Sequence, residues 1–458
     1  MSIENAKSKL AGLFGERFTT NKSILEGHGS DESYFPVILP DGVVFPENKE
    51  EVSQIITICN EENCPVIPWG VGTSLEGHSL AVKGGITIDF SSMNKIIEVN
   101  DEDLNVVIQP GITREELNQE LRTTGLFFPI DPGANATLGG MASTRASGTT
   151  AVRYGTMKDN VLALEVVLAD GKIIRTGTKA KKDSAGYDLT SLFIGSEGTL
   201  GIITEITLKL QGQPEAISAA VCAFEEIEPA VNSVISIIQM GIPIARIELV
   251  DSAMIRGLNL WDKNFNLPET PHLFLEFHGS NTSVKEQAET VGEIISDFGG
   301  SDYKWATKTE DRNQLWKARH NSYYAAKALR PGCKVLTTDS CVPISKLSEA
   351  ILETVEDIEN SPLEGPIVGH VGDGNFHTAL LLDPDNPEEM AIAMEISARL
   401  NARSLKLGGT ITGEHGIGMG KMKYMQDQHG EAWRLMASIK RTLDPTNILN
   451  PGKVVELN

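Results

Sequence analysis

The chain has 458 residues, of which 40% are hydrophobic and 22% charged, and its formal net charge is −22 at pH 7. This length predicts two or three domains, and the acidic balance excludes nucleic acid or an anionic lipid surface as the main partner. No stretch approaches 18 consecutive apolar residues, so the sequence predicts no membrane-spanning helix.

Cysteine usage and the N-terminal segment bear on the compartment. Five cysteines without a Cys-x-x-Cys pair are typical of reduced intracellular thiols. Residues 1–18 carry Glu4 and Glu16 and have no continuous apolar core, which is not typical of a secretory signal. The sequence therefore predicts a cytoplasmic protein, with attachment to the inner face of a membrane through a surface patch as an open alternative.

The first glycine-rich region follows a predicted helix. Residues 50–62 place apolar side chains at helical spacing, and Pro65 then ends that pattern. Residues 66–78 are expected to form a short strand and a loop with glycines and hydroxyls, which suits phosphate binding by backbone amides. The loop lacks the Gly-Lys-Ser/Thr of a P-loop and the third glycine of a dinucleotide fingerprint. A simple cluster of turns is an equally good interpretation of this region alone.

Strands and a capped helix follow. Residues 85–90 and 104–109 alternate well enough to belong to a sheet. A helix is predicted to begin at the N-cap Thr113, with Glu116 three residues later as a capping box, and to end near Thr124.

Two further regions are dense in small residues. Residues 131–148 and 195–201 contain glycine, alanine, serine or threonine at most positions. Strands are predicted at 161–171 and from Ile202 to Leu210. Three such loops in one half of the chain exceed what turns alone need, and together they suggest an extended nucleotide cofactor.

The second half begins at Pro214 and mixes strands with helices. We predict strands at 217–224 and 274–278 and helices at 229–240 and 285–298. Such a mixture is typical of an α+β domain.

Two cations in this half are candidate anion ligands. Residues 314–324 have a helical pattern that places Arg319 on an apolar-to-aromatic face, where it needs an anionic partner or a route to water. A carboxylate substrate would be such a partner. The pattern alone favours a surface arginine whose stem lies along the protein. Lys334 is a second candidate cation for the same pocket.

A hairpin at residues 369–377 carries two histidines. Asp373-Gly374 is the dipeptide of a two-residue type I′ turn, which predicts that His370 and His377 lie opposite each other. Opposed Cβ atoms on one face are about 4.5 to 5.5 Å apart, so both rings can reach one small ion. The alternative, two ordinary polar residues on a solvated strand face, is equally compatible with the pattern alone.

A glycine-rich loop at residues 408–418 adds a carboxylate. Glu414 completes, with two histidines, a ligand set typical of a catalytic metal site with open positions. Zinc fits this set, and manganese or iron fits too. His415 then remains as an imidazole in the position of a general base. Helix-cap and turn chemistry is the competing interpretation of this Glu-His pair.

The chain resembles the FAD-dependent D-lactate dehydrogenases of the vanillyl-alcohol-oxidase type flavoprotein superfamily. The resemblance lies in the order of its motifs, which are the three small-residue regions, Trp316-x-x-Arg319-His320, residues 369–377, Gly413-Glu-His-Gly416 and Asn450-Pro-Gly-Lys453. It implies an α+β fold made of a PCMH-type FAD-binding domain of two α+β subdomains over 1–212 and a cap domain with an antiparallel sheet over 213–410. Residues 411–458 would return to the FAD-binding domain.

The resemblance also implies which residues line FAD. They are Trp69, Gly70, Val71, Gly72, Thr73, Ser74, Gly77, His78, Pro132, Gly133, Thr137, Gly139, Gly140, Ser143, Ser147, Gly148, Gly198, Ile203 and Asn450. Many relatives have glycine in place of His78, and a histidine is a covalent flavin tether in some flavoproteins of the superfamily. We predict non-covalent FAD.

A mechanism follows from the resemblance. Arg319, with Lys334 as a second catalytic cation, would hold the carboxylate of a small D-2-hydroxy acid. A divalent zinc or manganese ion on His370, His377 and Glu414 would bind the α-hydroxyl oxygen, and His415 would remove the hydroxyl proton while the flavin takes the hydride. D-Lactate would become pyruvate.

The sequence leaves alternatives open for the substrate, the electron acceptor and the oligomeric state. Relatives that act on D-2-hydroxyglutarate have asparagine where this chain has Ala379, which favours a small monocarboxylate. Glycolate or another D-2-hydroxy acid remains an alternative substrate, and a flavin-binding subunit of a multi-subunit oxidase or a flavin-free metallohydrolase is an alternative function. The electron acceptor would be a cytochrome, a quinone or an electron-transfer flavoprotein, and a homodimer is possible.

Overall fold

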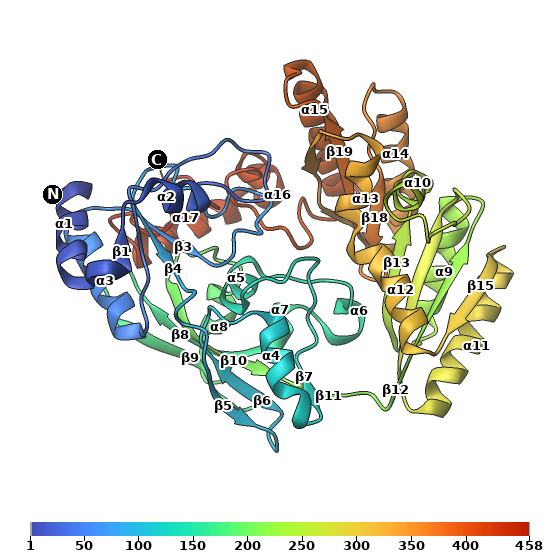
Figure 1. The fold of residues 1–458 in the computed structure, drawn as a ribbon, viewed down its shortest axis with the longest axis horizontal. Coiled ribbons are helices and arrows are strands. Elements are labelled where there is room, and N and C mark those ends of the chain that lie inside the picture. The colour runs from blue at the N-terminus through green and yellow to red at the C-terminus, as the bar shows by residue number, and fades with distance from the viewer. Residues whose placement is uncertain (1, 458) are drawn as a thin grey trace. The chain divides into compact units, whose positions relative to one another are not determined.

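The computed structural model describes residues 2–457, and the chain forms two compact units. The first unit comprises Met1–Ser147, Gly155–Gln213 and Glu414–Asn458, and the second comprises Gly148–Tyr154 and Pro214–Gly413. The short segment Gly148–Tyr154, which contains α6 (Ala151–Tyr154), therefore belongs to the second unit although it interrupts the first in sequence. Helices and antiparallel sheets occur together, which confirms the α+β class (Figure 1).

A four-stranded sheet forms one half of the first unit. Its order is β1 (Phe18–Thr19), β2 (Gly42–Val44), β4 (Ile86–Asp89) and β3 (Val66–Trp69), with β2, β4 and β3 parallel. Helices α1 (Ile3–Phe14), η1 (Gly15–Arg17), α2 (Lys22–His28) and α3 (Lys49–Glu61) belong to this half. Ile55 and Ile56 of α3 pack with Ile86 and Ile88 of β4 in a fully buried core, which fixes the start of the loop after β3.

An antiparallel five-stranded sheet forms the other half of the first unit. Its order is β5 (Ile96–Asn100), β6 (Asn105–Ile108), β10 (Ile202–Lys209), β8 (Val161–Val167) and β9 (Ile173–Gly177), and β7 (Leu126–Phe127) pairs separately with β11 (Gln211–Gly212). The helices here are α4 (Arg114–Glu120), η2 (Leu121–Thr123), α5 (Leu138–Thr144), α7 (Met157–Asn160) and α8 (Leu189–Phe193). The predicted capping box of Thr113 and Glu116 is present at the start of α4, so this prediction is confirmed.

The C-terminal segment of the first unit packs onto the four-stranded sheet. It contains η4 (Met422–Tyr424), α16 (Met425–His429) and α17 (Glu431–Leu443). After α17, the backbone N–H of Val66 donates to the Ile448 carbonyl (2.7 Å) and the N–H of Asn450 donates to the Val66 carbonyl (2.8 Å). These bonds attach the end of the chain beside β3.

The second unit is built on an antiparallel sheet. Its order is β15 (Ser301–Ala306), β12 (Ala216–Ala223), β14 (His272–Gly279), β13 (Ile244–Val250), β18 (Ile367–His370), β19 (Asn375–Leu382) and β16 (Lys334–Thr337), and β17 (Ser340–Cys341) also pairs with β19. Its helices are α9 (Ile227–Gln239), α10 (Ser252–Trp261), α11 (Asn281–Asp297), α12 (Thr309–His320), α13 (Ser322–Leu329), η3 (Ile344–Lys346), α14 (Leu347–Glu359) and α15 (Pro387–Lys406).

The two faces of this sheet have separate cores, because side chains alternate along each strand. Ile247 and Leu249 of β13 pack on one face with residues of α9, α11 and α14, whereas Val250 packs on the other face with residues of α10, α12 and α13. The second face also carries the polar residues of the candidate site described below.

The predicted register of the histidine hairpin is wrong. His370 lies opposite Asn375, and His377 lies opposite Val368, so the two strands are joined by four residues instead of two. Asp373 does not have the positive φ that a type I′ turn requires, and only Gly374 does, at +77°. A Cβ on Gly374 would lie 2.1 Å from the Val342 carbonyl oxygen. A glycine is therefore needed at this position, because the backbone of Val342, in another segment of the same chain, lies too close for a side chain.

The helix predicted over 314–324 is also interrupted. Helix α12 ends at His320 and α13 begins at Ser322, with Asn321 at the junction. Arg319 thus occupies the last turn of α12.

Asp251 is a buried helix cap whose ionisation affects stability. Its carboxylate accepts the Met254 N–H at the start of α10 (2.7 Å), and burial raises the pKa of Asp251 to about 7. An unfolded aspartate ionises near pH 4, so the folded chain holds an extra proton between about pH 4 and 7, and stability falls as the pH rises through that window.

We expect Asp251→Asn to raise the free energy of unfolding of the second unit at pH 8 by roughly 1 kcal/mol or more, because asparagine caps the helix and never ionises. At pH 4 the variant and the parent should be nearly equal. Urea denaturation at both pH values measures this difference. An equal effect at the two pH values would contradict the prediction.

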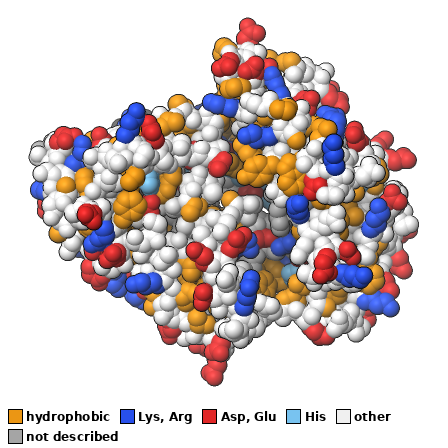
Figure 2. Space-filling view, in the orientation of Figure 1, with side chains coloured by type: hydrophobic (Ala, Val, Ile, Leu, Met, Phe, Trp, Pro, Cys, Tyr) orange, Lys and Arg blue, Asp and Glu red, His pale blue; other side chains and the backbone are white. Residues whose placement is uncertain are grey.

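The surface mixes both signs of charge. On the face drawn in Figure 2, Asp and Glu side chains alternate with Lys and Arg side chains. Within residues 2–457, no helix combines the length and the apolar character needed to cross a bilayer.

Candidate active site

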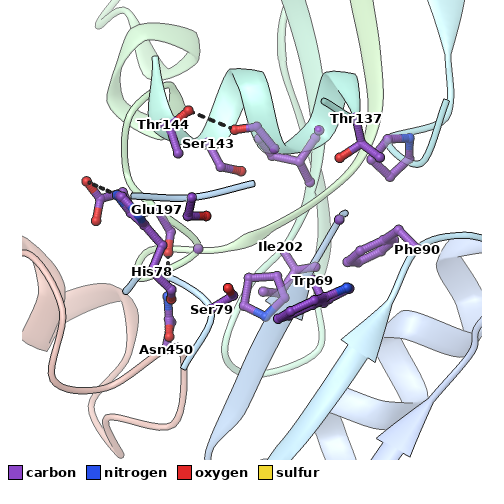
Figure 3. A pocket seen from close by; sticks show the side chains of 18 of the residues that line it. Trp69, His78, Ser79, Phe90, Thr137, Ser143, Thr144, Glu197, Ile202 and Asn450 are labelled. Atoms are coloured by element: carbon purple, nitrogen blue, oxygen red, sulfur yellow. Dashed lines mark hydrogen bonds and ion pairs between the residues drawn. The ribbon is translucent and has the colours of Figure 1, made fainter. Parts of the chain in front are cut away.

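A pocket in the first unit gathers the three small-residue regions. It is lined by Pro68, Trp69, Gly70, Ser74, His78, Ser79, Phe90, Pro110, Thr137, Gly139, Gly140, Ser143, Thr144, Glu197, Gly198, Gly201, Ile202, Ile203 and Asn450. Figure 3 shows Thr137, Ser143 and Thr144 on one side of the pocket, across from Trp69 and Ser79. The pocket thus joins the end of β3, the helix α5, the loop before β10 and the C-terminal segment.

Most of the residues predicted to line FAD line this pocket. They are Trp69, Gly70, Ser74, His78, Thr137, Gly139, Gly140, Ser143, Gly198, Ile203 and Asn450. The remaining predicted residues are not among those that line it: Val71, Gly72, Thr73, Gly77, Pro132, Gly133, Ser147 and Gly148. Gly148 belongs to the second unit. The FAD contacts of all these residues stay a prediction.

The wall of the pocket fits a ligand rich in polar groups. Three buried polar atoms on it, His78 Nδ1, Ser79 Oγ and Asn450 Oδ1, have no hydrogen-bond partner among residues 2–457. Buried polar atoms normally have such a partner, so these atoms indicate a ligand that supplies donors and acceptors. The backbone also comes close to its neighbours: a Cβ on Gly70 would lie 2.3 Å from Thr137 Oγ1. Both features suit FAD.

A buried ion pair that the sequence did not predict lies at this wall. His78 Nε2 is 3.3 Å from Glu197 Oε1, and the carboxylate accepts the N–H groups of Ile417 (2.7 Å) and Gly418 (2.8 Å). Burial alone would raise the pKa of Glu197, but the charge of His78 and these hydrogen bonds outweigh burial and lower it. Burial alone would lower the pKa of His78, and Glu197 raises it. Each partner thus favours the charged form of the other.

Glu197 had one signal in the sequence. It is an acidic residue inside a run of small residues, and its φ of +54° is one that residues other than glycine rarely adopt. An acidic residue in such a loop can be proposed as a ligand or cap, but its partners 220 residues later cannot be read from the sequence.

Gly198 provides a test of the pocket. Its φ is +71°, and a Cβ there would lie 2.4 Å from Pro68 Cγ. We expect Gly198→Ala to weaken FAD binding by roughly tenfold or more, because the left-handed conformation alone costs about 1–2 kcal/mol for a residue with a side chain. Fluorescence titration of the apoprotein with FAD measures the dissociation constant.

Gly212→Ala is the matched control, because a Cβ at Gly212 has no heavy atom of the described chain within 4 Å. Equal FAD affinity of the two variants would count against this pocket as the flavin site.

The second candidate site is a group of polar side chains on the sheet of the second unit. Leu249 of β13 is opposite Gly369 of β18, so the next residues outward, Glu248 and His370, are opposite each other. Glu248 Oε1 accepts a hydrogen bond from His370 Nδ1 (2.7 Å). Both side chains are buried.

The two histidines share one face in spite of the different register. His370 and His377 are diagonal neighbours, two positions apart, and their ring centroids are 5.4 Å apart. A shift of the register by an even number of residues keeps side chains on the same face, which is why the predicted pair still meets. A potential ligand atom of each ring lies within 4.8 Å of the other.

Each of the two rings has a hydrogen-bond contact at Nδ1. His370 Nδ1 bonds to a carboxylate, and His377 Nδ1 lies 3.3 Å from the Thr338 carbonyl oxygen. Carboxylates and carbonyls accept hydrogen bonds, so in the neutral imidazole these contacts favour the tautomer with the proton on Nδ1 and the lone pair on Nε2. Two imidazole lone pairs close together fit a divalent cation such as zinc or manganese.

Arg319 is buried, so the interpretation of a surface arginine is wrong. Its relative exposure is 8%, and its anionic partner is Glu248. Arg319 Nε donates to Glu248 Oε2 at 2.8 Å, and Nη2 lies 2.7 Å from the same oxygen. The partner is thus a carboxylate of the chain itself, 71 residues earlier.

Asp339 is a further acidic residue that the sequence did not suggest. It is buried and lies 3.6 Å from His377 Nδ1, and it accepts hydrogen bonds from Asn375 Nδ2 (2.7 Å) and the Gly413 N–H (2.8 Å). The sequence gives only a weak indication of this residue, because a single aspartate shortly after a strand is common.

The remaining predicted residues differ in position. Lys334 is exposed at the start of the edge strand β16, opposite Leu382. Leu382 is five residues along β19 from His377, roughly 17 Å at the rise of a strand, so the structure does not bring Lys334 to the histidines. Glu414 and His415 follow Gly413 directly and begin the last segment of the first unit.

Comparison with known families and proteins now gives the affiliation. The FAD binding domain family matches residues 40–177, and the family described as FAD linked oxidases, C-terminal domain, matches residues 213–454. A probable mitochondrial D-lactate dehydrogenase of Danio rerio is 50% identical over 461 residues, which cover 100% of this chain and 93% of that protein. A mitochondrial D-lactate dehydrogenase (cytochrome) of Arabidopsis thaliana is 44% identical over 451 residues, which cover 98% of this chain and 79% of that protein.

Solved structures agree on the fold. Crystalline p-cresol methylhydroxylase with substrate bound matches with a TM-score of 0.81 at 19% identity, over 99% of this chain and 97% of that one. At this identity the match concerns the fold alone. The resemblance inferred from the motifs is confirmed by the family matches and by the two full-length relatives, and this chain belongs to the family of FAD-linked oxidases.

Proposed function

We propose that this chain oxidises D-lactate, or a similarly small D-2-hydroxy acid, to the 2-oxo acid with FAD as cofactor. The observation that carries the proposal is the buried group of Arg319, Glu248, His370 and His377 in a chain whose full-length relatives are named D-lactate dehydrogenases. A cation can bind the carboxylate of an α-hydroxy acid, and two imidazole lone pairs can hold a metal ion that binds its hydroxyl.

Arg319 is the group that would bind the substrate carboxylate. A guanidinium has two edges with paired N–H groups, and Glu248 uses only the edge of Nε and Nη2. The edge of Nη1 is then directed at a carboxylate of the substrate, which fixes the α-carbon in one orientation. Lys334, which the sequence suggests as a second cation for the same pocket, would need a different position of its strand.

His370, His377 and Glu414 are the proposed ligands of a divalent zinc or manganese ion. Support comes from the Nε2 lone pairs of the two rings and from the link between Gly413 and Asp339, which anchors the residue before Glu414 beside His377. When bound, the ion supplies a Lewis acid for the substrate hydroxyl oxygen, and FAD supplies a two-electron acceptor.

His415 is the proposed base. Oxidation of D-lactate to pyruvate removes the hydroxyl proton and the Cα hydrogen with its electron pair. An imidazole nitrogen of His415 would take the proton, as a general base.

Anaerobic reduction of the purified flavoprotein tests the proposal. We expect D-lactate to bleach the flavin absorbance, L-lactate to leave it unchanged, and glycolate and D-2-hydroxyglutarate to react more slowly. Metal analysis of the same sample is expected to find about one zinc or manganese ion per chain. Equal reduction by both lactate enantiomers, or none by D-lactate, would overturn the proposed substrate.

The acceptor and the compartment belong to the same proposal. A relative named as a cytochrome-type dehydrogenase supports a cytochrome as acceptor, and reduction of cytochrome c during D-lactate turnover tests it. The sequence predicts the cytoplasm, whereas the names of both relatives given above are those of mitochondrial proteins. A homodimer stays a prediction.

A further inference from the structure

Glu248 connects the two groups to which the proposed function assigns separate tasks. Its carboxylate is fully buried, with 0% relative exposure, on the sheet face that carries His370. One oxygen accepts the His370 Nδ1–H (2.7 Å), and the other accepts from Arg319 Nε (2.8 Å) and lies 2.7 Å from Nη2. A single side chain thus contacts both the anion-binding cation and a metal-binding imidazole.

The contact with Arg319 fixes which edge of the guanidinium remains for the substrate. Guanidinium N–H groups lie in one plane, so a carboxylate held on the Nε edge also sets the direction of the Nη1 edge. The same carboxylate neutralises the buried cation before substrate arrives. Without it, Arg319 would be a stronger but poorly directed anion-binding group.

The contact with His370 fixes the tautomer of the imidazole. A carboxylate that accepts from Nδ1 keeps the proton there and leaves the lone pair on Nε2. Partners of this kind orient metal-binding histidines and raise their basicity, and their loss typically costs about 10- to 100-fold in metal affinity or activity.

We propose that Glu248 is a positioning residue, which orients Arg319 toward the substrate carboxylate and His370 toward the metal ion at the same time. This inference rests on the proposed function, because it assigns Glu248 a task in the binding of that substrate and that ion. Glu248 touches neither of them in this role and acts through its two neighbours.

The test compares Glu248→Gln with Glu276→Gln. Glu276 is a matched control: it is buried on the adjacent strand, its carboxylate bonds to His278 Nε2 (2.8 Å), and it forms an ion pair with Arg246 (3.5 Å). In each FAD-loaded variant the dissociation constant of Mn²⁺ is measured by titration of the metal-free protein, and kcat and KM are measured with D-lactate and a dye acceptor.

We expect Glu248→Gln to weaken Mn²⁺ binding by about 10- to 100-fold and to lower kcat by at least about tenfold, with KM unchanged or lower. KM does not rise because Arg319 loses its competing carboxylate. Glu276→Gln should keep Mn²⁺ affinity and kcat within about twofold of the parent. If Glu248→Gln does not fold, Glu248→Asp replaces it, and its shorter side chain is expected to cause the same loss of Mn²⁺ affinity.

Other results overturn the inference. Unchanged Mn²⁺ affinity and kcat in the Glu248 variant would do so, as would an equal loss in the Glu276 variant, which marks a purely structural role. If the parent protein binds no Mn²⁺, then His370 holds no metal ion, and the role proposed for its contact with Glu248 is wrong. Parent protein that binds Mn²⁺ but does not oxidise D-lactate overturns the proposed function alone, and the metal titration still decides the role of Glu248.

Discussion

His370→Ala is expected to lose the divalent ion and to lower kcat with D-lactate by roughly 10³-fold, because a Lewis acid at the reacting oxygen supplies several kcal/mol of stabilisation to the transition state. The variant loses one of two imidazoles that are diagonal neighbours on the sheet and that each offer a ligand atom within 4.8 Å of the other. Metal analysis of the purified protein and steady-state turnover measure the two effects.

His272→Ala is the matched control for this result. His272 is a buried histidine on β14, which is separated from the strand of His370 by β13, and its Nδ1 bonds to the Thr270 carbonyl (2.7 Å). It should keep both metal and kcat. Full metal content in His370→Ala would remove His370 from the ligand set.

Arg319→Ala is expected to raise KM for D-lactate by roughly 100-fold and to destabilise the second unit by about 3–5 kcal/mol. The first effect follows from the loss of charge-assisted hydrogen bonds to the carboxylate, each of which contributes about 1.5–3 kcal/mol. The second effect follows because Glu248 would remain buried without its cation. FAD content should not change, since the residues that line the candidate flavin pocket belong to the first unit.

A double variant separates these two effects. Arg319→Met combined with Glu248→Leu replaces the buried ion pair by apolar side chains of similar size, which often restores stability. We expect the free energy of unfolding in urea to recover most of its loss, while KM and kcat remain impaired. If Arg319→Ala is as stable as the parent protein, the hydrogen bond from His370 is enough to hold the buried Glu248 carboxylate, and the predicted loss of stability is wrong.

Local patterns in the sequence predicted elements but not their partners. The capping box of Thr113 and Glu116 was predictable, because both of its hydrogen bonds join residues three positions apart. The hairpin register was not, because Asp373-Gly374 satisfies a two-residue turn as well as the four-residue loop that forms. The contact of Gly374 with Val342, a residue of another segment, favours the longer loop.

Arg319 illustrates the same limit in the candidate site. Helical spacing placed it on an apolar face, and that pattern is satisfied equally by a side chain that extends to water or by a buried one with a counter-charge. The burial of Trp316 one turn earlier and the position of Glu248 on β13 decide for the buried state. Both depend on how the helix packs on the sheet, which the sequence of the helix alone does not determine.

The order of the motifs determined the family by resemblance, and the mixture of strand and helix patterns determined the α+β class, because both depend on short-range spacing. The residues that the resemblance names for FAD stay a prediction. Tertiary structure alone decided which carboxylates complete the sites: Glu197 for His78, Glu248 for Arg319 and His370, and Asp339 near His377. The physical reason is that a buried charge needs a counter-charge within a few ångströms, and strand register and helix packing supply that neighbour from a distant part of the chain.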